Sequence, residues 1–174
     1  MPRSIPNYEA AIDSSGLLEE LREFDPRVVG TLPLDLSTPT SDVDVVCHVT
    51  DTAAFAEIVW RRYSLCEGFA LYQWRSSLRP VVARFNWGGW PFELFGDPRP
   101  VDQQEGWLHF EIERRLLALD DGRLRKAVAD HRARGMKTEP AFAVVLGIAG
   151  DPYAGLLALA RESDAHLRAR LERL

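Results

Sequence analysis

The chain has few cysteines and no long apolar segment, and both absences limit what it can be. Only Cys47 and Cys66 occur, nineteen positions apart and without a CxxC pair. They predict reduced thiols rather than a zinc site or a disulfide framework. The opening Met-Pro-Arg-Ser-Ile-Pro has no apolar signal region, and no stretch approaches the length of a membrane span. We therefore expect a cytoplasmic protein that does not enter a membrane.

Composition predicts one folded domain of ordinary character. The 174 residues are 46% hydrophobic and 27% charged, which suffices for a sizeable core. The net charge of −5 argues against a protein that coats nucleic acid non-specifically. It leaves room for a local basic patch, so the charge disfavours nucleic acid as a partner without excluding it.

Periodicity and turn signals divide the chain into an α/β half, 1–98, and a helical half, 99–174, which we expect to pack as one compact unit. Helices are expected over 17–24, begun by Ser14 or Ser15, and over 52–63. Strands are expected over 27–30, 43–49, 69–74, 81–87 and 90–95, with Gly88-Gly89 as a two-residue hairpin turn. The later helices are expected over 103–119, 123–134, 139–148 and 153–171.

Two carboxylates at i and i+2 open the strand expected at 43–49. Asp42 and Asp44 share one face of that strand, while Val43 and Val45 enter the other. Paired carboxylates repel each other unless a cation lies between them, and oxygen ligands suit Mg²⁺ or Mn²⁺. Gly30-Thr31 can form a turn whose N–H groups and hydroxyl face phosphate. Together these residues predict a site for a metal-bound nucleoside triphosphate.

Glu93 is a third acid in an unusual place. It lies between Phe92 and Leu94 in an expected strand, where a carboxylate is costly to bury unless it is paired or bound to metal. One interpretation makes it a metal ligand. The alternative is an exposed edge position, or an ion pair with Arg84 on the neighbouring strand.

These residues resemble the pattern of the nucleotidyltransferase superfamily, which has the polymerase-β-like fold: Gly-Ser, about ten residues, Asp-apolar-Asp, then a third acid on a nearby strand. The chain resembles more specifically a bacterial family of nucleotidyltransferase-like proteins with no established reaction. The shared stretches are Gly30-Thr-x-Pro, Ser41-Asp-x-Asp, Glu93-x-Phe-Gly96, His109-x3-Glu113, Lys137-Thr-Glu-Pro-Ala-Phe142 and Gly150-Asp-Pro-Tyr153.

The resemblance implies an α/β (α+β) fold, with a mixed twisted sheet, flanking helices and a helical C-terminal half. It makes Asp42 and Asp44 ligands of Mg²⁺ or Mn²⁺, and through the metal of an NTP. Glu93 would hold a second metal or accept the proton of the attacking hydroxyl. Residues expected to contact the nucleotide are Gly30, Thr31, Ser41 and Lys137.

Two departures from the superfamily pattern matter. Thr31 replaces the usual Ser, a mild change because both carry a hydroxyl. The loop from Leu32 to Thr40 lacks the glycines and basic residues that often hold phosphate. This second departure bears on triphosphate binding more than on the fold.

His109 and Glu113 are spaced to share one helix face. The simpler interpretation is a hydrogen bond on the helix surface; the alternative is a proton relay or phosphate contact. His48 lies too far along its strand to join Asp44 at one ion and is expected to be structural. Trp87, Trp90 and Trp107 could stack on a base, but core packing is the simpler role.

A basic run over 123–137 could meet phosphates or an acidic partner, although most of it is expected to be a solvated helix face. Lys137, just beyond the helix stop at Gly135, is its best functional candidate.

The leading hypothesis is transfer of a nucleotidyl group from an NTP to an unidentified hydroxyl acceptor. The second is an inert binding or regulatory module of the same fold, and the third is metal-assisted phosphoester hydrolysis.

Overall fold

The structure is a computed structural model that describes residues 7–174 and divides into two compact units. The first unit contains residues 7–32 and 41–104 of the described chain, and the second contains 33–40 and 105–174. The sequence-based division at residue 98 stays a prediction. No helix of the described chain is long and apolar enough to cross a membrane.

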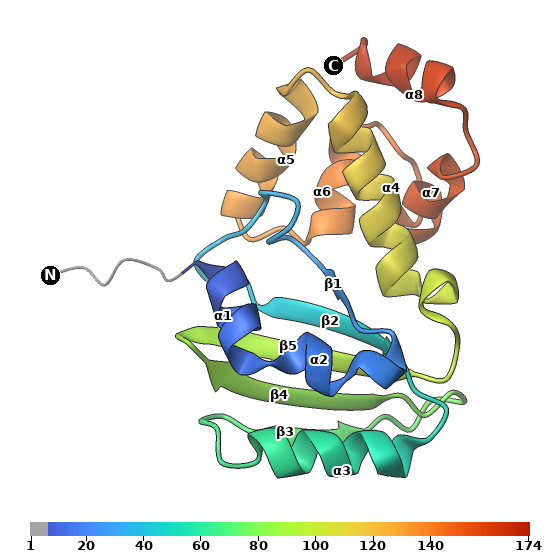
Figure 1. Ribbon diagram of the computed structural model, residues 1–174. Helices are drawn as coiled ribbons and strands as arrows, with labels where there is room; N and C mark the ends of the chain where they lie inside the picture. The colour runs from blue at the N-terminus through green and yellow to red at the C-terminus, as the bar shows by residue number, and fades with distance from the viewer. Residues whose placement is uncertain (1–6) are drawn as a thin grey trace, which may run out of the picture. The chain divides into compact units, whose positions relative to one another are not determined.

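The first unit is built on a five-stranded mixed sheet (Figure 1). Its strands lie in the order β1-β2-β5-β4-β3, where β2 and β5 pair in parallel and the other pairs are antiparallel. The strand bounds are β1 Arg27–Val29, β2 Val43–His48, β3 Ala70–Gln73, β4 Val81–Trp87 and β5 Trp90–Asp97. The expected mixed sheet is therefore confirmed.

The β4–β5 hairpin forms for the reason that the sequence indicates. Trp87 and Trp90 pair across a two-residue turn, and Gly88 and Gly89 both have positive φ, at 59° and 86°. Two consecutive positive φ values suit the right-handed twist of the flanking strands and favour glycine at both positions.

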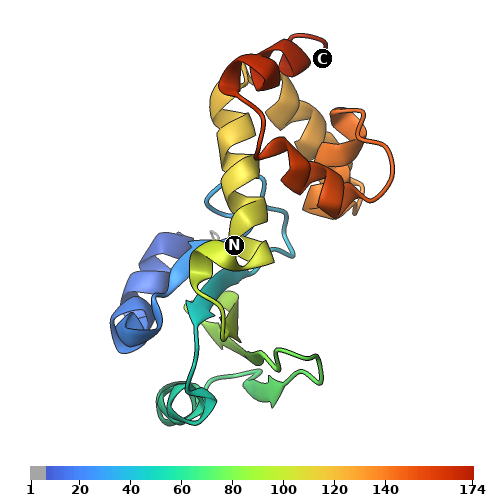
Figure 2. The ribbon, with the colours of Figure 1, turned by 90° about the vertical axis from the view of Figure 1, so that its right-hand side faces the viewer.

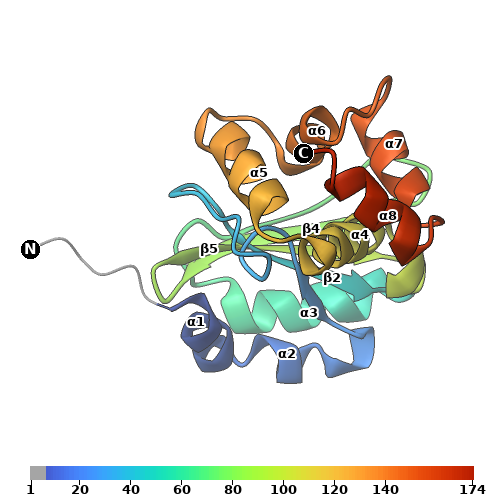
Figure 3. The same cartoon turned by 90° about the horizontal axis from the view of Figure 1, so that it is seen from above.

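Helices cover one face of this sheet (Figures 1 and 3). They are α1 Tyr8–Ser15, α2 Leu17–Glu20, the 3₁₀ turn Arg22–Phe24 and α3 Thr52–Tyr63. Beneath them, the Tyr63 ring stacks on Phe85 at 4.4 Å, and Phe85 stacks on Phe92 at 5.2 Å. Within the first unit as described, the opposite sheet face has no covering helix (Figure 2).

The first helix differs from expectation. Ser14 and Ser15 were expected to begin a helix over 17–24, but they end α1, which Asn7 caps through a bond from the Glu9 N–H at 2.9 Å. Gly16, with a φ of 67°, separates α1 from the short α2. Only Ala11, Ile12 and Ser15 of α1 are buried, so its apolar pattern is too short to predict a helix.

The second unit is helical, as expected. Its helices are α4 Glu105–Leu119, α5 Arg123–Ala133, α6 Thr138–Val145, α7 Pro152–Leu159 and α8 Asp164–Leu171. The single helix expected over 153–171 is wrong, because Ser163 starts a new helix by accepting a hydrogen bond from the His166 N–H at 3.3 Å. The segment 33–40 joins this unit through buried Leu34 and Leu36, and Arg125 donates to the Leu34 carbonyl.

Candidate functional site

The Gly30-Thr31 turn lies directly beside Asp44. Antiparallel pairing of β1 with β2 sets Val29 opposite Asp44, so the turn begins next to that carboxylate. Gly30 has a φ of 78°, and a Cβ on it would lie 2.2 Å from Asp44 Oδ2. The Thr31 and Ser41 hydroxyls hydrogen-bond at 3.1 Å. Of the predicted nucleotide contacts, the structure thus brings Gly30 against Asp44 and joins Thr31 to Ser41.

Asp44 and Glu93 occupy matching positions in adjacent strands. They are partners in the parallel β2–β5 ladder, so both side chains leave the same face of the sheet. Val43 and Val45 point the other way and belong to the buried core. The strand parity predicted for Asp44 is therefore confirmed, and Glu93 lies on the same face.

Glu93 is engaged by a cation of the protein itself. Arg84, its partner on β4, donates from Nε to Glu93 Oε2 at 2.6 Å and forms an ion pair through its Nη2. The hydrogen bond and charge of Glu93 raise the pKa of Arg84, and Asp42 adds to that shift. Asp42 therefore lies within electrostatic reach of this pair. The ion pair with Arg84 is the alternative that the sequence left open.

The three predicted metal ligands have the chemistry that a divalent cation prefers. Asp42, Asp44 and Glu93 supply only oxygen ligands, which hard cations such as Mg²⁺ prefer. Within residues 7–174, however, no three His, Cys, Asp or Glu side chains form a group that could hold a metal ion. The predicted metal site stays a prediction, and it requires Glu93 to leave Arg84.

Lys137 belongs to the second unit. It is exposed and directly precedes α6, where its backbone is extended with a ψ of 159°. Its nucleotide contact stays a prediction.

His109 and Glu113 are buried, so the expected surface hydrogen bond is wrong. Their exposed fractions are 7% and 4%, and neither His109 Nδ1 nor Glu113 Oε1 has a hydrogen-bond partner in the described chain. Burial raises the pKa of Glu113 from 4.5 to about 8, Glu139 adds to the shift and Arg132 opposes it. Burial also lowers the pKa of His109. A protonated carboxyl next to a neutral imidazole is therefore the form near pH 7.

Other stretches contribute to the surroundings of this pair. The Tyr153 ring meets the His109 ring edge-to-face at 5.8 Å. The negative charges of Glu139 and Asp151 raise the pKa of His109 and so oppose the effect of burial. The sequence placed these residues only in separate motifs. These residues come together because α4, α6 and α7 pack against one another. The spacing of residues along α4 alone could not predict that packing.

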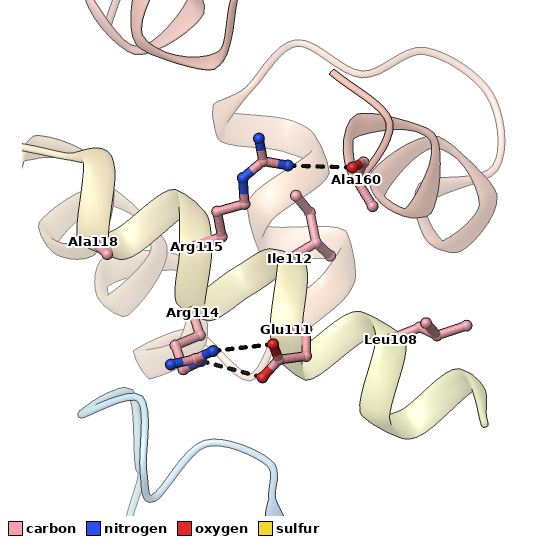
Figure 4. Close-up of a pocket in the computed structure, with 7 residues that line it drawn as sticks. All are labelled: Leu108, Glu111, Ile112, Arg114, Arg115, Ala118 and Ala160. Carbon is pink, nitrogen blue, oxygen red and sulfur yellow. Dashed lines mark hydrogen bonds and ion pairs between the residues drawn. The ribbon is translucent and has the colours of Figure 1, made fainter. Parts of the chain in front are cut away.

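A surface pocket of about 380 Å³ lies along α4 (Figure 4), lined by Leu108, Glu111, Ile112, Arg114, Arg115, Ala118 and Ala160. Its charged groups are already engaged. Arg114 binds Glu111 at 3.0 Å, and Arg115 donates to the Ala160 carbonyl at 3.2 Å and to Asp164 at 2.6 Å. These contacts hold the end of α7 and the start of α8, which makes this pocket a structural feature.

A family comparison matches most of the chain. The profile of the family described as "Domain of unknown function (DUF4269)" matches residues 10–159. The chain belongs to this family. Comparison of the DUF4269 protein with curated proteins found no match.

Solved structures show the fold of this DUF4269 protein. It is similar to a structure of the GLD-2/RNP-8 complex, with a TM-score of 0.57 and 9% identity over 98% of this chain and 77% of that one. It is similar to the Cid1 poly(U) polymerase bound to MgATP, with a TM-score of 0.55 and 14% identity over 90% and 49%. For a cytoplasmic RNA terminal U-transferase the TM-score is 0.50 and the identity 16%, over 74% and 38%. The chain thus spans less than two thirds of several neighbours and has the nucleotidyltransferase fold.

We predict that Gly30→Ala destabilises the DUF4269 protein more than Gly135→Ala. Both glycines have positive φ, but only Gly30 has a neighbour, Asp44, within 4 Å of the added Cβ. The control should lose about 1 kcal/mol from backbone strain alone. Gly30→Ala should lose roughly 2–4 kcal/mol in urea denaturation because the Asp44 carboxylate must also move. Equal losses would show that the turn does not hold Asp44.

We predict that Glu113 makes stability fall as pH rises. Its folded pKa of about 8 exceeds its unfolded value of 4.5, so the folded state binds the proton more tightly. The stability it provides is complete below pH 4.5 and is lost progressively up to pH 8. Glu113→Gln should remove this dependence, and at pH 8 it should be more stable than wild type by on the order of a few kcal/mol.

The wild-type-minus-variant difference isolates Glu113, because His109 titrates in both proteins. Glu111→Gln, on the same helix but partly exposed and paired with Arg114, is the matched control and should keep the wild-type slope. Chemical denaturation from pH 5 to 8.5 provides the measurement. A pH-independent difference would contradict the buried protonated state.

Proposed function

We propose that this protein transfers a nucleotidyl group from an NTP to a hydroxyl acceptor with the help of a divalent metal. The observation that carries the proposal is the placement of Gly30 against Asp44, with Asp44 in register with Glu93. A backbone turn that carries a hydroxyl, next to two carboxylates on one sheet face, suits a triphosphate bound through a cation.

The chain's own groups have separate roles in this proposal. The Gly30-Thr31 turn binds the phosphates, and its close approach to Asp44 sets them beside the carboxylates. Asp42 and Asp44 hold the cation. When bound, a divalent metal would neutralise phosphate charge and polarise the α-phosphorus.

Glu93 acts on the acceptor. It takes the proton of the attacking hydroxyl as a new bond forms between that oxygen and the α-phosphorus. The bond between the α-phosphorus and the bridging oxygen breaks, and pyrophosphate leaves. Before the acceptor arrives, Glu93 is held in its ion pair with Arg84, which it must leave in order to take the proton.

The second candidate is an inert module that keeps the fold. The same Arg84–Glu93 ion pair favours it, because a carboxylate held by an internal cation is less available to a proton or a metal. The loop over 33–40, which carries leucines in place of basic residues, points the same way.

We expect Asp42→Ala to abolish NTP-dependent pyrophosphate release and NTP binding in Mg²⁺. Glu93→Gln should retain NTP binding but lose about 10²–10⁴-fold in turnover, because a general base is removed while the cation site keeps its aspartates. Glu57→Gln is the control, an exposed acid on α3. A coupled pyrophosphate assay and equilibrium dialysis measure both steps. Wild-type protein that binds no NTP with either Mg²⁺ or Mn²⁺ would favour the inert module.

Mn²⁺ should raise the thermal unfolding midpoint of the wild-type protein, because a cation that binds only the folded state stabilises it. We expect the midpoint to rise by roughly 2–4 °C for each kcal/mol that Mn²⁺ binding adds to the free energy of unfolding. Asp44→Asn should abolish the rise, whereas Asp51→Asn, which retains an α3 cap, should keep it. Differential scanning fluorimetry gives both midpoints. An unchanged Mn²⁺ response in Asp44→Asn places the ion elsewhere.

A further inference from the structure

Exposed aromatic side chains lie on the same sheet face as the carboxylates. Tyr72, on β3, is 38% exposed, and Trp74, just beyond β3, is 48% exposed. Figure 1 shows β3 at the edge of the sheet. Trp74 packs edge-to-face on Phe95 of β5 at 5.3 Å. By contrast, Trp87 and Trp90, which the sequence singled out for stacking, pack against the core.

The register places Tyr72 in the row next to the site, and Trp74 meets that row through its ring contact with Phe95. Tyr72 pairs with Val82, and Val82 with Phe95, which follows Glu93 by two residues on β5. Two residues along a strand span about 7 Å, and both side chains leave the same face. Tyr72 also contributes to the pKa of Arg84, the partner of Glu93. The row that contains Tyr72 and Phe95, here called the aromatic row, therefore lies next to the row that contains Asp44 and Glu93.

The turn after β3 is ordered by its own hydrogen bonds. The Trp74 N–H donates to the Pro80 carbonyl at 2.9 Å. The Gln73 side-chain amide donates to the Arg79 backbone carbonyl at 2.8 Å, and the Arg79 guanidinium donates to Gln73 Oε1 at 3.0 Å. The indole is thus held at the sheet edge without a bound partner. Such preorganisation lowers the entropic cost of binding.

Two arginines follow Tyr72 and Trp74 on the turn after β3. Arg75 and Arg79 are exposed on the same turn, and Arg75 makes no ion pair within the described residues. Exposed aromatics beside arginines suit a planar ring carried on an anionic chain: the ring stacks and the guanidinium groups meet phosphate.

We propose that Tyr72 and Trp74 form a stacking platform for the terminal bases of a single-stranded nucleic acid. Arg75 contacts its backbone, and the terminal hydroxyl extends along β5 toward Glu93. The acceptor role rests on the proposed function, but binding at the platform does not. An apolar protein partner fits less well, because the uncompensated arginine would be buried against it.

The test uses a fluorescein-labelled, ten-nucleotide single-stranded RNA of mixed sequence, in EDTA and without NTP. Fluorescence anisotropy should show binding by the wild-type chain that Trp74→Ala weakens about tenfold and Trp74→Phe partly restores. Trp60→Ala is the matched control, since Trp60 is 60% exposed and also meets a phenylalanine edge-to-face, at 5.6 Å. It should bind as wild type does.

Two further arms separate stacking from charge. An abasic strand of equal length should bind wild type as weakly as RNA binds Trp74→Ala. Arg75→Ala should lower the salt dependence by about 0.7 in the log–log slope, the value for one contact to a single-stranded phosphate.

The platform is overturned by equal binding of RNA to Trp74→Ala and wild type, by equal loss in Trp60→Ala, or by equal affinity for the abasic strand. Absence of wild-type binding at about 100 μM protein overturns it too. The binding test contains neither metal nor NTP and is therefore independent of turnover. RNA binding in this test, together with no pyrophosphate release when the same RNA is supplied with NTP and Mg²⁺, would refute the transferase and leave the platform standing.

Discussion

Parallel pairing of β2 with β5 sets Asp44 beside Glu93, and the neighbouring features of the site follow from that register. The same pairing aligns Val45 with Leu94 on the core face. A slip of one residue would bury the acids and expose the aliphatic side chains, which the core forbids. The stack of Tyr63, Phe85 and Phe92 stabilises the sheet from the helical side. Hydrophobic packing on one face therefore holds the carboxylates on the other.

The ion pair between Arg84 and Glu93 separates the two functional candidates. Both side chains are partly exposed, at 57% and 26%, and exposed ion pairs contribute only about 0–1 kcal/mol. A bound cation and triphosphate could therefore displace Arg84 at small cost. A released Arg84 would lie next to the aromatic row, where a second anionic ligand would meet it. In the inert module, which binds no ligand, the ion pair with Arg84 instead neutralises the charge of Glu93.

The helical unit holds a different kind of chemistry. Glu113 and His109 are buried without partners for one atom each, and the first turn of α6 contributes Glu139 nearby. Buried polar groups cost stability when they lack hydrogen bonds, so their retention needs a reason beyond packing. The carboxyl group of Glu113 is neutral when buried, and its ionisation destabilises the folded state.

The sequence by itself determined the local elements and the residue types of the site. Alternation predicted the strands, the Asp51 cap predicted α3, and the Gly88-Gly89 pair predicted the hairpin. Only Ala11, Ile12 and Ser15 of α1 are buried, so its apolar pattern is short, whereas the break before α8 has a local signal, the capping Ser163 followed by Asp164. Only the tertiary structure decided which groups meet: Gly30 with Asp44, Arg84 with Glu93, Tyr153 with His109, and Trp74 with Phe95. These pairs depend on strand register and helix packing, which many distant contacts set together and no local stretch encodes.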